Sequence, residues 1–412
     1  MLGTGRAFAA LVVFASAPAL AGIPQGGLAN LARTESAQAS EGAGDIRVRL
    51  DQISSSVTIT GVGLRFTGQS PTRNDQFQAV RLSWKKSPGG DARWTVTDRD
   101  SKQVLATIDG KAMRVMGSSV RMNLKPMPPK LTFRIATGGK VDVIASLGLE
   151  EYVRGVLPME MPRSWPLEAL KAQAVAARTF ALYRKAERER VKASYHLETT
   201  TLDQVYLMPV VEEGGDATQA NVERAVRETA GMVLHDRRGR AFATFFHADC
   251  GGRTEDPKVI WGSGESPGTV VDGACPLNPS GQWRLSLSGD EIAQRLRGQV
   301  SRGPKLAVVG IQSLTRTGSG RIGRMKLTYS DGSTETIPAH QFRMSLGAER
   351  VKSTNFKVAV SEGKFELSGR GFGHGVGLCQ WGTRHLASKG KAFDEILRHY
   401  YPRAVLTSSL EP

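Results

Sequence analysis

The sequence predicts an α+β fold, in which an antiparallel β-rich region precedes a mixed α+β domain. Between Asp45 and Ala145, short stretches of alternating apolar and polar residues are separated by Gly, Ser, Asp and Pro, a pattern typical of antiparallel strands. After residue 146, apolar residues recur at helical spacing, and further strand-like stretches follow. The 412 residues, 40% of them hydrophobic, suffice for two or three domains and exclude a chain that is disordered throughout.

The first 44 residues are expected to lie outside this fold. Arg6 precedes the apolar run AFAALVVFASAPALA, whose small residues Ala19 and Ala21 complete a secretory signal over 1–21. A membrane anchor would need about 20 unbroken apolar residues, and Pro18 comes too early. Residues 22–44 are small and polar, which indicates a flexible linker. We therefore expect an exported protein of the periplasm or cell envelope, with no integral membrane span in the mature chain.

The remaining elements follow from local patterns. In the β-rich region 45–145, strands are predicted at 46–50, 56–60, 93–98, 120–124, 131–135 and 141–145. The second domain, 146–404, is predicted to have helices at 149–155, 166–190, 221–231, 292–296, 380–390 and 394–401. Pro166 opens the long helix, and Ser288 with Glu291 forms a capping box for the fourth. Strands are predicted around the turn Arg238-Gly239 and within 308–360.

The net charge and a glycine motif indicate which classes of partner the chain binds. The net charge of +16 favours binding to an acidic polymer. The residues Gly318, Gly320 and Gly323 fit the spelling GxGxxG of a dinucleotide site. That site needs a helix after the glycines, whereas MKLTYSDGSTETI predicts a strand, a turn and a strand. We expect neither a nucleotide site nor a nucleic acid partner.

The segment GVLPMEMPRSWP offers a candidate acid. Glu160 lies between Met159 and Met161, close to prolines and Trp165. Apolar neighbours remove hydration from a carboxylate and raise its pKa, as a general acid working near neutral pH requires. The alternative is that Glu160 points to solvent or caps the following helix.

Two basic residues and a glycine-rich segment could complete a site. Lys171 and Arg178 are two helical turns apart on one face, either as a solvated basic stripe or as groups that bind a substrate. In RGFGHGVGLCQWG, glycines alternate from Gly371 to Gly377, which suits a backbone that something approaches closely. His374 and Gln380 could then face a ligand. The alternative is a tightly packed β-bulge hairpin with His374 in the core.

Three cysteines occur in this exported chain. Cys250 and Cys275 are predicted to form a disulfide, and Cys379 is predicted to be buried and inert. The spacing His247-x-x-Cys250 could instead begin a zinc site, but the sequence offers no two further ligands at metal spacing.

Taken together, four segments resemble the stage II sporulation protein D (SpoIID/LytB) family, in order between Leu149 and Pro402: LEEYVRGVLPMEMPRSWPLEALKAQAVAARTFAL, LDQVY, FFHADCGGRTED and GRGFGHGVGLCQWG. The resemblance implies a lytic transglycosylase that cleaves between N-acetylmuramate and N-acetylglucosamine in peptidoglycan glycan strands and leaves 1,6-anhydromuramate ends. A non-catalytic role in enhancing a partner N-acetylmuramoyl-alanine amidase is also attributed to this family.

The resemblance also implies roles for individual residues. Glu160 corresponds to the catalytic acid and base, and Lys171 and Arg178 to residues that activity requires. The substrate groove would include His374 and Gln380, with Gly373 and Gly375 of the glycine-rich block. A second acid beside Glu160 could come only through the fold, from Asp203, Asp249 or Glu255.

The resemblance does not imply a cofactor for this chain. Some relatives bind zinc through one histidine and two cysteines shortly after the long helix, where this chain has His196 and no cysteine between Tyr195 and Tyr206. We therefore expect no cofactor, and zinc only as the weaker alternative.

Overall fold

The structure, a computed structural model, describes residues 45–66, 77–87, 89, 91–199, 203–208, 217–240, 242–273, 275, 278, 281–298 and 306–408. The predicted signal (1–21) and linker (22–44) lie outside the described residues. The chain divides into two compact units. The sheet unit comprises the described residues of Gln25–Met159 and Ala181–Gly215, and the mixed unit those of Glu160–Phe180 and Asp216–Pro412. The sheet unit thus extends beyond the predicted limit at residue 145.

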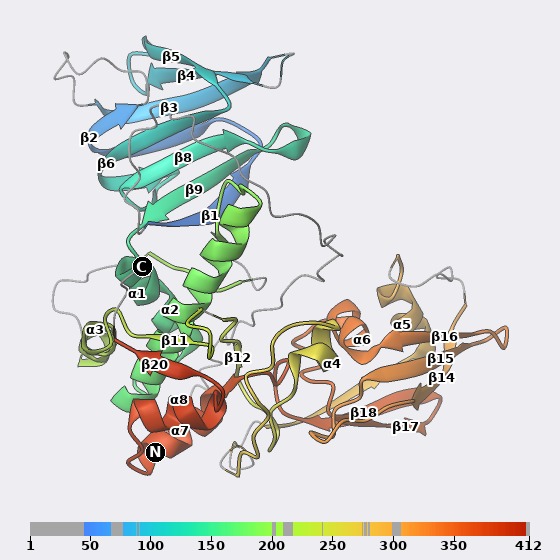
Figure 1. Cartoon of the computed structure of the whole chain (residues 1–412). Helices are drawn as coiled ribbons and strands as arrows, with labels where there is room; N and C mark the ends of the chain where they lie inside the picture. The colour runs from blue at the N-terminus through green and yellow to red at the C-terminus, as the bar shows by residue number, and fades with distance from the viewer. Residues whose placement is uncertain are drawn as a thin grey trace, which may run out of the picture. The chain divides into compact units, whose positions relative to one another are not determined.

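Ten strands of the described residues form the sheet of the sheet unit, in the order β10-β1-β9-β8-β6-β2-β3-β4-β5, with β7 paired to β6 (Figure 1). Neighbouring strands are antiparallel, and β10 is parallel to β1. The bounds are β1 Ile46–Ile53, β2 Val57–Phe66, β3 Phe77–Lys86, β4 Ala92–Asp98, β5 Val104–Gly110, β6 Ala112–Met122, β7 Lys125–Pro126, β8 Lys130–Ile135, β9 Val141–Leu147 and β10 Leu197–Glu198. Alternation places Trp94 and Val96 of β4 in the core and Arg93 in solvent, as the β-rich pattern predicted.

Two helices follow the sheet in the chain. Helix α1 (Leu149–Glu160) is longer than predicted, and the 24-residue helix α2 (Leu167–Arg190) begins and ends as predicted. The first half of α2 belongs to the mixed unit and the second half to the sheet unit. Among the described residues, no helix is both long enough and apolar enough to span a bilayer.

The mixed unit contains the remaining elements. Its first part has α3 Ala217–Glu228, β11 Val233–His235, β12 Phe246–His247 and α4 Pro257–Trp261, and its C-terminal part has β19 Leu378–Cys379, α7 Gln380–Ser388, α8 Phe393–Tyr400 and β20 Val405–Thr407. The helices predicted at 221–231, 380–390 and 394–401 are therefore present, within a few residues at each end.

Two strands flank the turn at Arg238-Gly239, as predicted: β11 before it and β12 after it. The turn itself forms, because the N–H of Gly239 bonds to the carbonyl of Asp236. The two strands do not pair with each other, since β11 pairs with β20 and β12 pairs with β19. Both strands thus take their partners from the C-terminal part of the chain.

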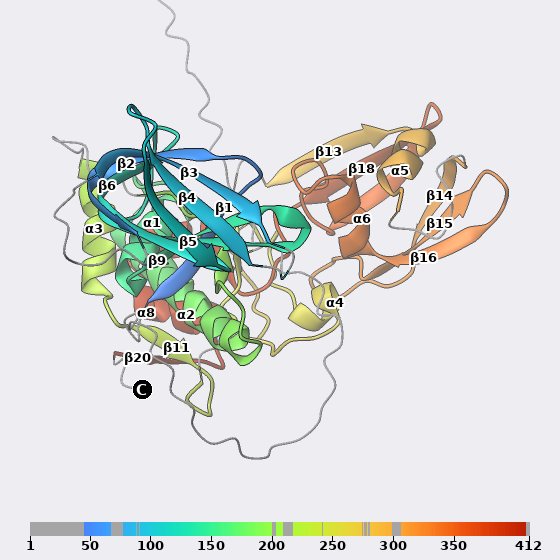
Figure 2. The same ribbon diagram turned by 90° about the horizontal axis from the view of Figure 1, so that it is seen from above.

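Between these two parts in the sequence, the described residues include six strands and two helices, α5 and α6 (Figure 2). The strands form the sheets β13-β18-β17 and β14-β15-β16, with bounds β13 Gln282–Leu287, β14 Val308–Ser313, β15 Arg324–Tyr329, β16 Thr334–Pro338, β17 Phe356–Ser361 and β18 Lys364–Arg370. Helix α5 (Gly289–Arg295) has the predicted cap, in which Ser288 accepts from the N–H of Glu291. Helix α6 (Ala339–Leu346) was not predicted, because its eight residues lie within a stretch, 308–360, whose alternation indicates strands, although Ala339, Phe342 and Leu346 recur at helical spacing. The predicted α+β class is confirmed.

Gly155 of α1 allows the segment around Tyr206 to pack closely against the helix. A Cβ added at Gly155 would lie 2.3 Å from Cε2 of Tyr206, whose ring stacks on Tyr152 at 5.8 Å. The N–H of Leu207 also bonds to the carbonyl of Gly155 at 3.3 Å. Any side chain at position 155 would push this segment away from the helix.

We predict that Gly155→Ala lowers the free energy of unfolding by about 1–2 kcal/mol, because overpacking of about 1–3 kcal/mol exceeds the helix propensity gained from alanine. Urea denaturation monitored by circular dichroism measures the change. Gly148→Ala is the matched control, since a Cβ there meets nothing within 4 Å. Equal stabilities of the two variants would contradict the prediction.

Candidate functional site

Glu160 is the last residue of α1 and is buried, with 3% of its surface exposed. It therefore has the low exposure that its apolar neighbours predicted, and it does not point into solvent. The chain turns directly after it, and Pro158 lies within the last turn of the helix.

The segment after Glu160 contacts the start of α7. The rings of Trp165 and Trp381 meet edge to face at 5.5 Å, and the guanidinium of Arg384 lies 5.6 Å from the first ring and 4.9 Å from the second. These three side chains, the tryptophan shelf, connect the segment after Glu160 with the residue that follows Gln380. Both tryptophans are half-buried, so they can present aromatic surface to a sugar. The sequence analysis missed Trp381 and Arg384, since nothing in their spacing indicates the contact.

Lys171 is paired with carboxylates. Its ammonium lies 2.8 Å from Glu168 and 2.6 Å from Glu228, and 5.8 Å from the ring centre of Phe393. Lys171 thus joins α2 to the end of α3 and the start of α8. It is not the isolated cation that its small apolar neighbours suggested.

Arg178 is fully buried and donates to the carbonyl of Met232 at 3.1 Å. Since Lys171 contacts Glu228, both cations face the same stretch of chain, as their two-turn spacing predicted. The next residue, Thr179, accepts from the N–H of Leu234. Arg178 therefore has a structural contact, and its contact with a substrate remains a prediction.

Other residues of the protein pack closely against the glycine-rich segment. At Gly375, where φ is 87°, a Cβ would lie 2.4 Å from Nε of Arg321. At Gly377, where φ is 72°, a Cβ would lie 2.0 Å from the carbonyl oxygen of Phe245. The alternating glycines thus allow tight packing against a buried arginine and a neighbouring backbone. The role of Arg321 was not predicted.

Two histidines hold the peptide groups of Val376, which lies between these glycines. Nδ1 of His247 lies 3.1 Å from the carbonyl of Val376, and Nδ1 of His374 accepts from its N–H at 3.0 Å. Because a carbonyl only accepts and an N–H only donates, the proton is on Nδ1 of His247 and on Nε2 of His374. Neither Nε2 atom has a hydrogen-bond partner among the described residues.

Both imidazoles are neutral at pH 7. Burial, followed by the charge of Arg321, lowers the pKa of His247 to about 3. Burial and the neighbouring His247 lower the pKa of His374 well below its usual value. The rings lie 5.5 Å apart, and Trp261 lies 5.1 Å from His374. His374 is thus a core residue whose second nitrogen keeps its donor capacity.

Gln380 is 2% exposed and begins α7 directly after Cys379, the N-cap residue of that helix. Gly373 is fixed through its N–H, which donates to the carbonyl of Lys352 at 2.8 Å. Direct contact of Gln380, Gly373 or Gly375 with a sugar remains a prediction.

Each of the three carboxyl groups that could serve as a second acid already has other partners in the structure. Asp203 belongs to the sheet unit and pairs with Arg184 at 2.8 Å. In the mixed unit, Asp249 contacts the thiol of Cys275 at 2.6 Å and accepts from the side chain of Asn278. Burial, followed by the neighbouring Cys275, raises the pKa of Asp249 to about 7.

Glu255 accepts hydrogen bonds from the hydroxyls of Thr317 and Ser319. Ser319 lies between the first two glycines of the discarded GxGxxG motif, which strand β15 follows as predicted. These glycines therefore belong to a turn that reaches a buried carboxylate.

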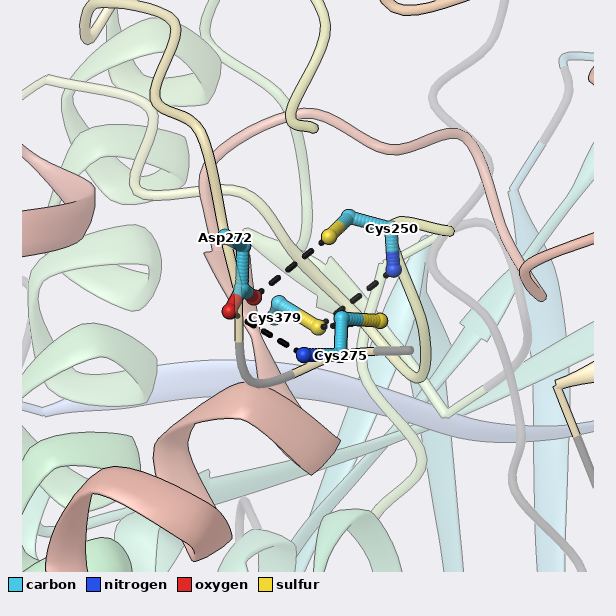
Figure 3. A group of neighbouring side chains, drawn as sticks. All are labelled: Cys250, Asp272, Cys275 and Cys379. Atoms are coloured by element: carbon cyan, nitrogen blue, oxygen red, sulfur yellow. Dashed lines mark hydrogen bonds between the residues drawn. The ribbon is translucent and has the colours of Figure 1, made fainter. Parts of the chain in front are cut away.

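The disulfide expected between Cys250 and Cys275 is not formed, because all three cysteines carry free thiols. Their sulfur atoms, together with a carboxylate oxygen of Asp272, converge on one point (Figure 3). Cys379 is buried as predicted, but it lies 3.6 Å from the sulfur of Cys275 rather than apart from the other cysteines.

The zinc position of some relatives does not fit this chain. His196 belongs to the sheet unit, and its Nδ1 accepts from the backbone N–H of Arg47 at 3.1 Å. Its other nitrogen lies 3.6 Å from Glu189, and burial followed by the charge of Arg47 lowers the pKa of His196 to about 3. With no cysteine between Tyr195 and Tyr206, His196 serves to fix strand β1.

One hollow of the mixed unit is strongly basic. It has a volume of about 1060 Å³. The described residues that line it include five cations and no carboxylate: Arg253, Arg284, Arg316, Lys357 and Arg370. Such a surface favours binding of an anionic chain or group.

Comparison with known proteins connects these residues to a family. The family model for the stage II sporulation protein, SpoIID, matches residues 137–235. A model for a domain of unknown function matches residues 279–377. This chain carries a SpoIID-family domain. The SpoIID match contains Glu160, Lys171 and Arg178 and ends before the histidine pair and the cysteines, so it covers only the first part of the stretch Leu149 to Pro402 that resembles the family.

Three relatives illustrate the similarity. An uncharacterized protein of Brachyspira hyodysenteriae is 35% identical over 262 residues, which cover 63% of this chain and 66% of the relative. An amidase enhancer of Bacillus subtilis is 29% identical over 301 residues, covering 62% and 40%. Stage II sporulation protein D of the same organism is 28% identical over 276 residues, covering 63% and 74%. The matched segments thus span only part of the length of each of these relatives.

We predict that Gly377→Ala lowers the free energy of unfolding by more than about 3 kcal/mol or prevents folding, because a Cβ would meet a backbone carbonyl that cannot move aside. Thermal unfolding monitored by circular dichroism measures this. Gly332→Ala is the control, since φ there is 78° but the space is open, and only the backbone strain of about 1–2 kcal/mol is expected. Similar losses in both variants would refute the tight packing.

We predict that His196 makes the sheet unit less stable in acid. Its folded pKa of about 3 lies below the ordinary value of 6.5, so the stabilisation is complete above pH 6.5 and falls as the unfolded state takes up a proton. Between pH 7 and pH 5 the loss is about 2 kcal/mol.

The control for this titration is His196→Asn, whose side-chain oxygen can accept from the N–H of Arg47 without titrating. Urea denaturation at both pH values should show a smaller pH dependence in the variant than in the wild type. Identical pH dependence of the two proteins would rule out His196 as the cause.

Proposed function

We propose that the chain acts on the bacterial cell wall as an exported lytic transglycosylase that cleaves peptidoglycan glycan strands. The SpoIID-family domain and the relatives named stage II sporulation protein D and amidase enhancer support a role related to the cell wall. The net charge of +16 and the basic hollow favour approach to an anionic polymer.

The observation that carries the proposal is the position of Glu160. This carboxyl group is 3% exposed within the SpoIID match, five residues before a tryptophan shelf suited to packing against a sugar ring. A carboxyl group held out of solvent is what a general acid for glycoside cleavage needs, and we infer that the nearby tryptophan shelf would pack against the sugar.

In the proposed reaction, Glu160 serves first as acid and then as base. It donates its proton to the oxygen that links N-acetylmuramate to N-acetylglucosamine, and the bond from this oxygen to C1 of the muramate breaks. The resulting carboxylate then takes the proton of the muramate C6 hydroxyl, whose oxygen bonds to C1. The product carries a 1,6-anhydro ring, Glu160 regains its proton, and no water is consumed. One carboxyl group suffices, whereas ordinary glycoside hydrolysis uses two.

The other candidate residues would support this step from a distance. Lys171 and Arg178 hold α2 against the segment 228–232, which makes them positioning residues for the loop that joins Glu160 to α2. The N–H at Nε2 of His374, which has no hydrogen-bond partner among the described residues, would donate to a polar group of the sugar. Gln380 and the glycine segment would border the same groove.

We predict that Glu160→Gln reduces the rate of glycan cleavage by at least about 10²-fold, because the amide can neither donate nor accept the proton. The assay measures 1,6-anhydromuramate ends by mass spectrometry after digestion of purified glycan strands, both bare and peptide-bearing. Glu151→Gln is the control, since it makes the same change on the same helix nine residues earlier. Reducing ends without the anhydro product would indicate hydrolysis instead.

A second candidate function is enhancement of a partner amidase without catalysis, which the relative named amidase enhancer favours. Under this alternative, the purified chain releases nothing from glycan by itself. It would accelerate an N-acetylmuramoyl-alanine amidase equally well as wild type and as Glu160→Gln.

A further inference from the structure

The cysteine–aspartate cluster consists of four residues from three separate segments, and each offers one ligand atom (Figure 3): Cys250, Asp272, Cys275 and Cys379. Each is at most 1% exposed. These ligand atoms all lie within 4.8 Å of one another. Three sulfurs and one carboxylate oxygen therefore surround a single point in the interior of the mixed unit.

Two of the distances between these ligand atoms are close to those in a tetrahedral zinc site. Zinc–sulfur bonds of about 2.3 Å and zinc–oxygen bonds of about 2.1 Å place sulfurs about 3.8 Å apart and a sulfur and an oxygen about 3.6 Å apart. Here the sulfurs of Cys275 and Cys379 are 3.6 Å apart, and the sulfur of Cys250 is 3.4 Å from Oδ2 of Asp272. A disulfide would need two sulfurs at about 2 Å, which would leave the third thiol and the carboxylate unused.

Backbone amides are directed at all three sulfurs. The sulfur of Cys379 accepts from the N–H of Cys250 at 3.3 Å and of Gly382 at 3.4 Å. The sulfur of Cys275 accepts from Gly251 at 3.3 Å, and that of Cys250 from Gly252 at 3.4 Å. A neutral thiol is a weak acceptor, whereas a metal-bound thiolate is stabilised by such donors.

The carboxylate is held in the same way. The hydroxyl of Tyr400 donates to Oδ2 of Asp272 at 2.8 Å, and the N–H of Cys275 donates to Oδ1 at 3.2 Å. These contacts orient a ligand oxygen toward the sulfurs, as outer partners do at zinc sites.

A buried cation offsets part of the negative charge that the thiolates and the carboxylate of the cluster would carry. Arg321 is fully buried and donates to the carbonyl of Cys250 at 2.9 Å, which places a cation beside the cluster. Oδ1 of Asp249 also lies 2.6 Å from the sulfur of Cys275, so a second carboxyl group borders the cluster. Three buried thiolates without a cation would be far more costly.

We propose that the cysteine–aspartate cluster binds one structural zinc ion. Four protein ligands fill a tetrahedral shell, which is the mark of a structural rather than a catalytic site. Three thiolates favour zinc over magnesium or calcium, which prefer oxygen ligands. This site is unrelated to the zinc position of some relatives, which would fall near His196 in the sheet unit.

The ion would fasten the parts that position the candidate site. Cys250 follows β12, Cys379 ends β19 and precedes Gln380, and Asp272 with Cys275 belongs to the loop after α4. Zinc would thus fasten three chain segments to one another, and it would protect the thiols from oxidation in an exported protein.

The test uses the full chain, purified in the presence of zinc and then dialysed. We expect about one zinc per chain by inductively coupled plasma mass spectrometry, and three reduced thiols that react with maleimide only after denaturation with a chelator. A mass that shows a Cys250–Cys275 disulfide would overturn the proposal. So would a zinc-free chain with thiols that stay reduced after zinc is added.

Cobalt substitution tests the ligands themselves. Tetrahedral cobalt bound by thiolates gives intense visible bands, and Cys379→Ser should weaken the sulfur-to-cobalt charge-transfer band by about one third as three thiolates become two. The control is His385→Ala, which removes another possible metal ligand of α7 and should leave zinc content and spectrum unchanged. Loss of zinc in the control but not in Cys379→Ser would show adventitious binding.

These measurements do not depend on the proposed function, because zinc content, thiol protection and the cobalt spectrum are read without any glycan. If Cys379→Ser does not fold, the zinc content and thiol protection of the wild-type chain still decide the matter.

Discussion

A two-residue parallel pairing, β12 with β19, is the contact on which the rest of the mixed unit depends. It sets His247 opposite Cys379, and the N–H of Leu378 bonds to the carbonyl of Phe245 beside it. Such a short pairing has few hydrogen bonds of its own, so its stability depends on close packing with the surrounding chain. Gly377 provides this, because its missing side chain lets the carbonyl of Phe245 come close. Helix α2 is tied to the same place, since Thr244 donates to the carbonyl of Ala176.

Polar groups buried around this pairing are fixed by backbone contacts rather than by ion pairs. His247 and His374 divide the two peptide groups of Val376 between them, which settles their tautomers and keeps both rings neutral. Arg321 fills the space above Gly375 and reaches the carbonyl of Cys250. Donors and acceptors fixed in this way need no rearrangement to bind a ligand, a preorganisation that would suit the reaction proposed for Glu160. The proposed zinc ion would act on the same pairing, since it joins the residues that follow β12 to the end of β19.

Much of this arrangement could be predicted locally. Pro166 and the apolar spacing located α2, Ser288 with Glu291 capped α5, and alternation located strands such as β4. Glu160 could be singled out because its neighbours are apolar. The alternating glycines indicated that another group packs closely against their backbone. The main error concerns the cysteines. The Cys250–Cys275 disulfide was inferred from their proximity in sequence, whereas both residues also contact Cys379, which lies more than 100 residues further along the chain.

The sequence by itself determined the α+β class, most helices with their caps, and the segments that match the SpoIID family, because these depend on residues a few positions apart. Only the tertiary structure decided that Lys171 is paired with Glu228, that the glycines admit Arg321 and Phe245 rather than open space, and that a third thiol joins Cys250 and Cys275. Cys250 and Cys379 are 129 residues apart, and their contact follows from the packing of β12 against β19. No local pattern encodes such a distance, since burial and pairing are properties of the whole folded unit.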